Sequence, residues 1–127
     1  MIGLVGSPKL PKTCIMWFGW RVGCFISNNI FHTTYSTLEN ITKPVNVEAI
    51  DGFIMITQYD IPWRYDIFNK WDFYDISQSF EFRKHGYQVI VPPVKSSWCF
   101  HDDGNMNLTH YYKIREIFKK EYADMLT

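Results

Sequence analysis

A helical segment joined to a strand by a single glycine constrains the fold of this chain more than any other feature. Residues 74–85 carry apolar side chains at helical spacing, among them Ile76 and Phe80. Gly86 suits the left-handed residue that ends a helix. The β-branched run over residues 87–91 predicts a strand, and the two prolines that follow it mark its end. A helix and a strand this close together indicate an α/β unit.

The remaining segments predict the other elements of a small α/β domain. Turn residues and apolar runs divide the chain into short pieces, and we see no internal repeat. We predict a single domain over residues 1–127, with a mixed sheet, one helix between strands and a C-terminal helix. The predicted pieces are a short strand over residues 1–5, a hairpin over 15–27, a surface loop over 28–44, two extended segments over 45–59 and a second helix over 107–125.

Composition and charge exclude several classes of protein. The formal net charge is zero and there is no basic stripe, so we expect no nucleic-acid partner. The apolar runs are shorter than the ~20 residues that a membrane span needs. Three widely spaced cysteines predict reduced thiols and a cytoplasmic protein. The aromatic content of 18% predicts either a ring-lined groove, suited to sugars or a protein segment, or a loop-rich core.

Asp75 is the first candidate for chemistry. A carboxylate at the start of a helix is stabilised as the anion by the exposed backbone N–H groups. At the edge of a cleft, such a group can accept a proton from a hydroxyl nucleophile. An aspartate at this position, Asp72 or Asp75, also caps the first turn of many helices without any further role. Both interpretations stay open from the local sequence.

The second candidate is the cluster His101-Asp102-Asp103, which we predict to lie in a loop. One imidazole beside carboxylates suits Mn²⁺ or Mg²⁺, although adjacent residues rarely all face one ion. Gly104 permits a tight turn that would aim His101 inward. The alternative is a histidine that makes ordinary hydrogen bonds within a loop.

A third set of residues suits an acceptor molecule. Asp51-Gly52 lies at a predicted strand bulge, where the carboxylate either binds a sugar hydroxyl or makes a turn. Trp63, Arg64 and Trp71 would form a platform that stacks on a sugar ring and binds it through the guanidinium. Packing of the two tryptophans under a loop is the alternative.

Five segments together resemble a known family. They are VEAIDG (47–52), TQYDIPWR (57–64), WDFYDISQSFEF (71–82), GY (86–87) and WCFHDDG (98–104). This set resembles the glycosyltransferase-like domain named after a streptomycin-biosynthesis protein, which is similar to the family 2 glycosyltransferases of the GT-A fold.

The resemblance implies a reaction and its residues. Asp75 falls on the catalytic base of family 2 enzymes, while Tyr74 occupies the position of a glutamate there. His101 falls on a histidine that completes a Mn²⁺ or Mg²⁺ site in many GT-A enzymes. The implied reaction is inverting transfer of a sugar from a nucleotide-sugar to a hydroxyl of a saccharide or another acceptor. Asp51, Gly52, Trp63, Arg64 and Trp71 would lie on the acceptor side.

The resemblance begins downstream of the nucleotide-binding half of a GT-A domain and of its DxD-like metal motif. It therefore implies an acceptor-side, C-terminal half, completed by a missing N-terminal half or by a homo-oligomer. Two rivals stay open. One is a non-catalytic carbohydrate-binding or protein-interaction module, which would use the exposed aromatic rings. The other is a metal-dependent hydrolase using His101 and Asp103, which only the distant His110 could assist.

Overall fold

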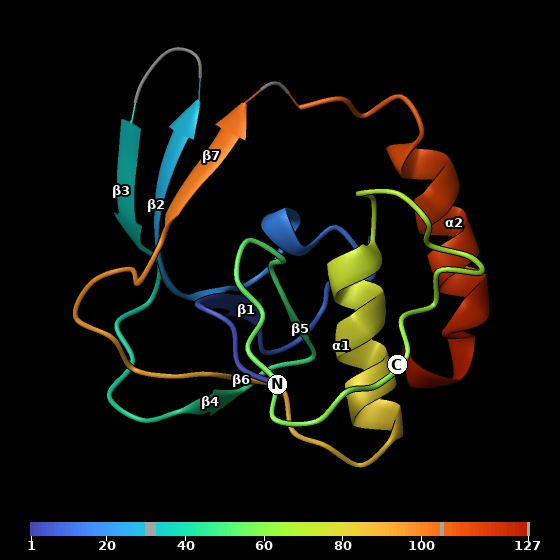
Figure 1. Cartoon of the computed structure of the whole chain (residues 1–127), viewed down its shortest axis with the longest axis horizontal. Helices are drawn as coiled ribbons and strands as arrows, with labels where there is room; N and C mark the ends of the chain where they lie inside the picture. Colours follow the sequence, from blue (N-terminus) through green and yellow to red (C-terminus); the bar gives the residue numbers. More distant parts are fainter. Residues whose placement is uncertain (30–32, 105, 127) are drawn as a thin grey trace.

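A branched sheet built around one long strand is the centre of the fold (Figure 1). The computed structural model describes residues 1–29, 33–104 and 106–126; for residues 28–29, 33–37 and 103–104 it describes the backbone. The first residues of β2 (Val22–Asn29) pair antiparallel with β1 (Val5–Ser7), which pairs antiparallel with β5 (Ala49–Ile50). The rest of β2 lies between β3 (Thr33–Thr37), which is antiparallel, and β7 (Phe100–Gly104), which is parallel.

The helices lie on the other side of the domain from β3 and β7 (Figure 1). Helix α1 (Tyr74–Lys84) follows β5, and α2 (Tyr111–Glu121) follows β7. Two short 3₁₀ turns, η1 (Met16–Phe18) and η2 (Ala123–Met125), complete the helical elements of the described residues. A second sheet pairs β4 (Val45–Asn46) with β6 (Ile90–Val91). No described helix is long and apolar enough to cross a membrane.

The predicted α/β class is confirmed, with one helix between strands and one at the C-terminal end. The predicted helix over residues 74–85 and the left-handed Gly86, with a φ of +84°, are also confirmed. The three cysteines are free thiols. The second helix begins at Tyr111, four residues later than predicted, because Asn107 instead accepts the N–H of Thr109 in a turn.

Several sequence predictions of strands were wrong. The predicted hairpin over residues 15–27 is a 3₁₀ turn followed by β2 alone. The predicted loop over residues 28–44 contains β3 and part of β2, and its residues 30–32 lie outside the described part of the chain. The polar, threonine-rich strand β3 lacks the apolar alternation of a half-buried strand. The predicted strands over 45–59 and 87–91 are reduced to two-residue ladders and isolated bridges.

A buried polar network fixes α2 against α1. The Tyr122 hydroxyl donates to Glu81 Oε1 at 2.8 Å and lies 2.9 Å from Ser77 Oγ. Glu81 is only 5% exposed, and Arg64 Nη1 lies 3.8 Å from the same carboxylate oxygen. Rings of Phe80 and Phe118 pack around this network. The carboxylate tolerates burial because each of these groups compensates part of its lost hydration.

Replacing Tyr122 with Phe tests this network. The substitution removes the hydroxyl but keeps the ring, so the buried Glu81 carboxylate loses its closest donor. We expect the free energy of unfolding to fall by about 1–3 kcal/mol, measured by urea denaturation. The control is Tyr112→Phe on the exposed face of α2, which should change it by less than about 0.5 kcal/mol. Equal effects of the two substitutions would contradict the network's role.

Candidate functional site

The carboxylate of Asp75 joins the first turn of α1 to the turn that follows β5. Its Oδ2 accepts the Gly52 N–H at 2.9 Å, and its Oδ1 accepts the Ile76 N–H at 2.8 Å. The N-cap residue of α1 is Phe73, with a φ of +60° and no side-chain capping bond, so neither Asp72 nor Asp75 is the N-cap. Asp75 therefore has a second partner outside its own helix, which an ordinary first-turn aspartate lacks.

Tyr74 lies so close to residue 52 that a side chain there would clash with it, which favours glycine. A Cβ at residue 52 would lie 2.1 Å from the Tyr74 hydroxyl oxygen and 2.9 Å from Asp75 Cβ. The Tyr74 ring lies beside two tryptophans, with centroid distances of 6.1 Å to Trp63 and 5.7 Å to Trp71. Three of the predicted acceptor-side residues, Gly52, Trp63 and Trp71, are thus grouped around Tyr74, next to Asp75.

Burial and a neighbouring carboxylate set the protonation of Asp75. Burial, followed by the charge of Asp51, raises its pKa to about 7, although the hydrogen bonds from Ile76 and Gly52 oppose the shift. Burial, followed by the charges of Asp75 and Asp51, also raises the pKa of Tyr74. The charge of one acidic side chain thus opposes ionisation of the other, and Asp75 gains and loses its proton near neutral pH.

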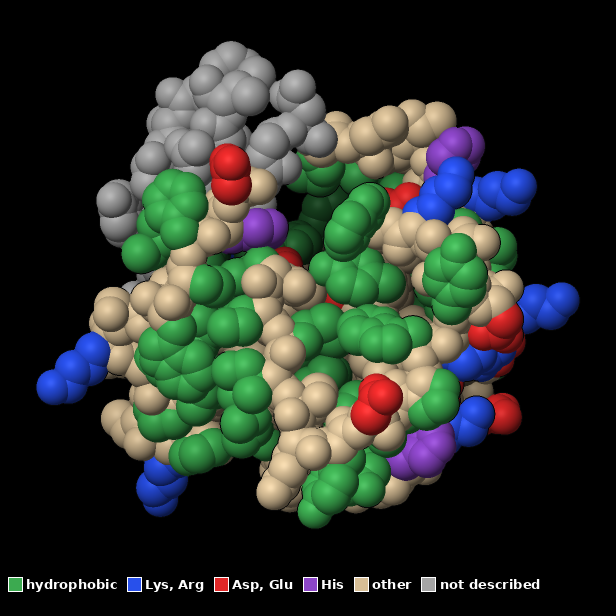
Figure 2. All heavy atoms as spheres, viewed as in Figure 1, with side chains coloured by type: hydrophobic (Ala, Val, Ile, Leu, Met, Phe, Trp, Pro, Cys, Tyr) green, Lys and Arg blue, Asp and Glu red, His purple; other side chains and the backbone are tan. Residues whose placement is uncertain are grey.

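His101 lies in strand β7, and not in the predicted loop, beside Ser27 of β2. Its imidazole stacks on Phe53, with ring centroids 5.1 Å apart and planes 16° apart. The Phe53 N–H donates to Asp51 Oδ1 at 3.3 Å. The segment 51–53 therefore contacts Asp75 through Gly52 and His101 through Phe53. Figure 2 shows a hollow on this face, between β7 and the start of α1, with a histidine and acidic side chains beside it.

The other residues predicted for the acceptor and metal sites lie in ion pairs or on the exposed surface. The guanidinium of Arg64 is engaged by three carboxylates, those of Asp66, Glu81 and Glu121. Trp71 is the most exposed large hydrophobic residue described, at 85%. Asp102 and His110 are exposed, and the side chain of Asp103 lies outside what is described. Arg64 thus anchors the chain beside Trp63, and its donors are largely occupied.

The described residues do not make a metal centre by themselves. Among residues 1–29, 33–104 and 106–126, no group of three or more His, Cys, Asp or Glu side chains is arranged to hold a metal ion. A divalent cation at His101 would need further ligands from water or a phosphate group, as Mg²⁺ commonly takes.

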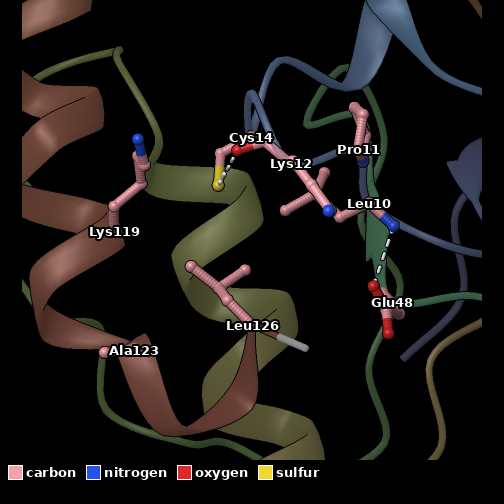
Figure 3. Close-up of a pocket in the computed structure, with 8 residues that line it drawn as sticks. All are labelled: Leu10, Pro11, Lys12, Cys14, Glu48, Lys119, Ala123 and Leu126. Carbon is pink, nitrogen blue, oxygen red and sulfur yellow. Dashed lines mark hydrogen bonds between the residues drawn. The ribbon is translucent and has the colours of Figure 1, made fainter.

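The cavity of about 360 Å³ shown in Figure 3 lies apart from these residues. None of the predicted site residues lines it. Its wall comes from the loop before η1, from Glu48 and from the end of α2, and contains the buried thiol of Cys14. Asp75, beside Asp51, has the shifted pKa that is typical of a catalytic acid or base, and neither residue lines this cavity.

The sequence analysis missed Phe53 and Arg21 as members of the site. Phe53 places the imidazole of His101, and Arg21 is the cation on which the charge of Asp51 acts. Each lies far along the chain from the residue that it meets, so no local pattern could have identified it. Tyr74 was noticed only for its sequence position and gains its setting from the contact with Gly52.

Comparison with known proteins gave one match. The sequence matches a family described as "Glycosyltransferase like family" over residues 1–122, nearly its full length. No curated protein and no solved structure matched.

The pH dependence of stability tests the setting of Asp75. Its folded-state pKa of about 7 exceeds the ordinary value of about 4. Between these values the folded protein binds more protons than the unfolded chain, so the free energy of unfolding falls as the pH rises. We expect the wild-type urea midpoint to fall from pH 5 to pH 8, and Asp75→Asn to remove most of that fall. Replacing the exposed Asp124 with Asn should preserve it. An unchanged fall in Asp75→Asn would refute the assignment.

Proposed function

The chain belongs to the glycosyltransferase-like family, which its sequence matches over residues 1–122, and on this premise we propose that it transfers a sugar from a nucleotide-sugar donor to an acceptor hydroxyl. The observation that carries the proposal is the Asp75 carboxyl, partly buried at the start of α1 with a pKa of about 7. A general base works best when its pKa lies near the working pH, because it is then both available and basic.

In the proposed reaction, Asp75 accepts the proton of the acceptor hydroxyl. The oxygen that loses this proton forms a bond to the anomeric carbon of the donor sugar. The bond between that carbon and the diphosphate breaks, and its electron pair leaves with the diphosphate. The hydrogen bonds from Gly52 and Ile76 hold the two carboxylate oxygens in place, so little reorganisation is needed at the moment of proton transfer.

The acceptor in this proposal is a saccharide. Trp63 and Trp71 flank Tyr74, and such rings stack well on the apolar faces of sugars. Asp51 is close enough to Asp75 for its charge to raise the pKa there, so it is placed to accept a second sugar hydroxyl. Arg64 contributes indirectly, because its ion pairs with Asp66 and Glu121 hold the segment that carries Trp63.

Three finer statements remain proposals. The domain is of the streptomycin-biosynthesis-protein type, as the segments 71–82 and 98–104 suggest. Its nucleotide-binding half is supplied by further chain or by a second copy, which the molecular mass of an active preparation tests. His101 assists a Mn²⁺ or Mg²⁺ ion that neutralises the diphosphate, and loss of Mn²⁺ binding in His101→Ala, measured by calorimetry, tests this.

Replacing Asp75 with Asn tests the base. The amide cannot accept the proton, so we expect turnover to fall by about 10²–10⁴-fold. Release of nucleoside diphosphate from a panel of nucleotide-sugars measures it, and the wild-type rate should rise with pH to a plateau above about 7. The exposed Asp124→Asn serves as the control. A loss of less than about tenfold in Asp75→Asn, ~1.4 kcal/mol, would reject Asp75 as the base.

A second function is favoured by the exposed tryptophans: a carbohydrate-binding module without catalysis. Trp71 is 85% exposed and Trp63 49%, and large exposed rings mark binding surfaces. In this case, Trp71→Ala should weaken saccharide binding on a glycan array about tenfold or more, because base or sugar stacking on a ring is worth roughly 1–3 kcal/mol. The control is Trp98→Ala, which removes another exposed tryptophan ring. Binding that survives in Asp75→Asn without any turnover of the wild type would favour the module.

A further inference from the structure

Arg21 is a partly buried cation held against an aromatic ring. Its guanidinium carbon lies 4.2 Å above the centre of the Trp17 ring. Trp17 in turn contacts Phe25 of β2 edge-on, with ring centroids 5.8 Å apart. Arg21 Nε is buried without a hydrogen bond, and within the described chain no ion pair engages the guanidinium. The ring therefore holds the side chain, and a ligand would reach it through the two Nη groups, because Nε is buried.

Arg21 belongs to the same region as the acidic pair. It immediately precedes Val22, which pairs with Gly6, and Gly6 also pairs with Ile50, the neighbour of Asp51. The charge of Asp51 raises the pKa of Arg21, against the larger lowering by burial. In the view of Figure 1, η1, which carries Trp17, lies between β7 and the start of α1. These are the two elements on either side of the hollow in Figure 2.

A guanidinium in this setting suits a phosphate group. Arginine keeps its proton under all ordinary conditions, and its planar fork of donors matches two phosphate oxygens at once. Burial of such a group without hydrogen bonds is unfavourable, so a ligand that supplies oxygen acceptors recovers this free energy. Arg21 is thus a fixed positive charge, held on Trp17 and within electrostatic range of Asp51.

We propose that Arg21, held on Trp17, binds the diphosphate of the donor through a direct contact of its guanidinium. The identity of the ligand as a sugar donor rests on the proposed function. The phosphate contact itself can be measured in the absence of any transfer. The competing interpretation is that Arg21 only covers Trp17 and balances the charge of Asp51.

Calorimetric titration of inorganic pyrophosphate into the full chain, in buffer with EDTA, tests the contact. We expect the wild type to bind, and Arg21→Gln to weaken binding tenfold or more. Arg21→Lys should fall between them, because lysine keeps the charge but loses the fork. The matched control is Arg115→Gln: Arg115 also lies over a ring, 5.2 Å from the centre of Tyr112, but pairs with Glu116. Its affinity should stay within about twofold of the wild type.

The proposal is overturned if the wild type binds no pyrophosphate in EDTA, or if Arg21→Gln binds it as tightly as Arg115→Gln does. Titration with uridine and guanosine diphosphates extends the test, since an affinity unaffected by Arg21→Gln would also overturn it. Trp17→Leu removes the supporting ring and should weaken pyrophosphate binding too, which covers the case in which Arg21→Gln fails to fold. Thermal unfolding of each variant checks folding.

These experiments distinguish failure of the proposed sugar transfer from failure of the phosphate contact at Arg21. Asp75→Asn should keep pyrophosphate affinity, because it alters the base and not the phosphate contact. A chain that binds pyrophosphate through Arg21 but turns over no nucleotide-sugar supports this inference and rejects the transferase. A chain that transfers sugar with the same donor KM in Arg21→Gln rejects this inference alone.

Discussion

The contact between α1 and the turn after β5 is the constraint on which the rest of the site depends. Two hydrogen bonds make it: Gly52 N–H to Asp75, and Ile50 N–H to the Ser79 hydroxyl. The Ser79 hydroxyl also donates to the backbone carbonyl of Asp75 at 2.9 Å. Because these bonds fix the start of α1 against the sheet, they also fix the distance between Asp75 and the segment 51–53. His101 reaches that segment from β7 through Phe53.

A second set of contacts, the ion pairs of Arg64, fixes the position of Trp63 beside this site. Arg64 pairs with Glu121 of α2 at 2.6 Å and lies near the buried Glu81 of α1. Trp63, the preceding residue, therefore has its backbone tied to both helices although its own ring is half exposed. A ring on a fixed backbone loses little conformational freedom when it binds, and this favours recognition over a ring on a free loop. The ion pairs of Arg64 thus favour the proposed saccharide binding because they position Trp63.

Local signals in the sequence predicted the α/β class, helix α1, Gly86 and the place of Asp75 at a helix start. Each of these depends on residues within a few positions of one another. The parallel pairing of β2 with β7 joins segments more than 70 residues apart along the chain, so the same reasoning placed His101 in a loop. The resemblance predicted Asp75 and His101 together, whereas only the fold supplied Phe53 between them. Arg21 had no signal, because Asp51 comes near it only through the pairing of β1 with β2 and β5.

A catalytic base and a bound phosphate group place opposite requirements on the charges around Asp75. An anion bound near Asp75 raises the pKa of that carboxyl further, because like charges oppose ionisation. A carboxyl whose pKa already lies near 7 would then be mostly protonated and unable to accept a proton. A cation beside the anion offsets this shift, and Arg21 is a cation whose pKa the charge of Asp51 raises. Holding the diphosphate in this way requires a cation that stays charged at every working pH, which arginine provides and histidine does not.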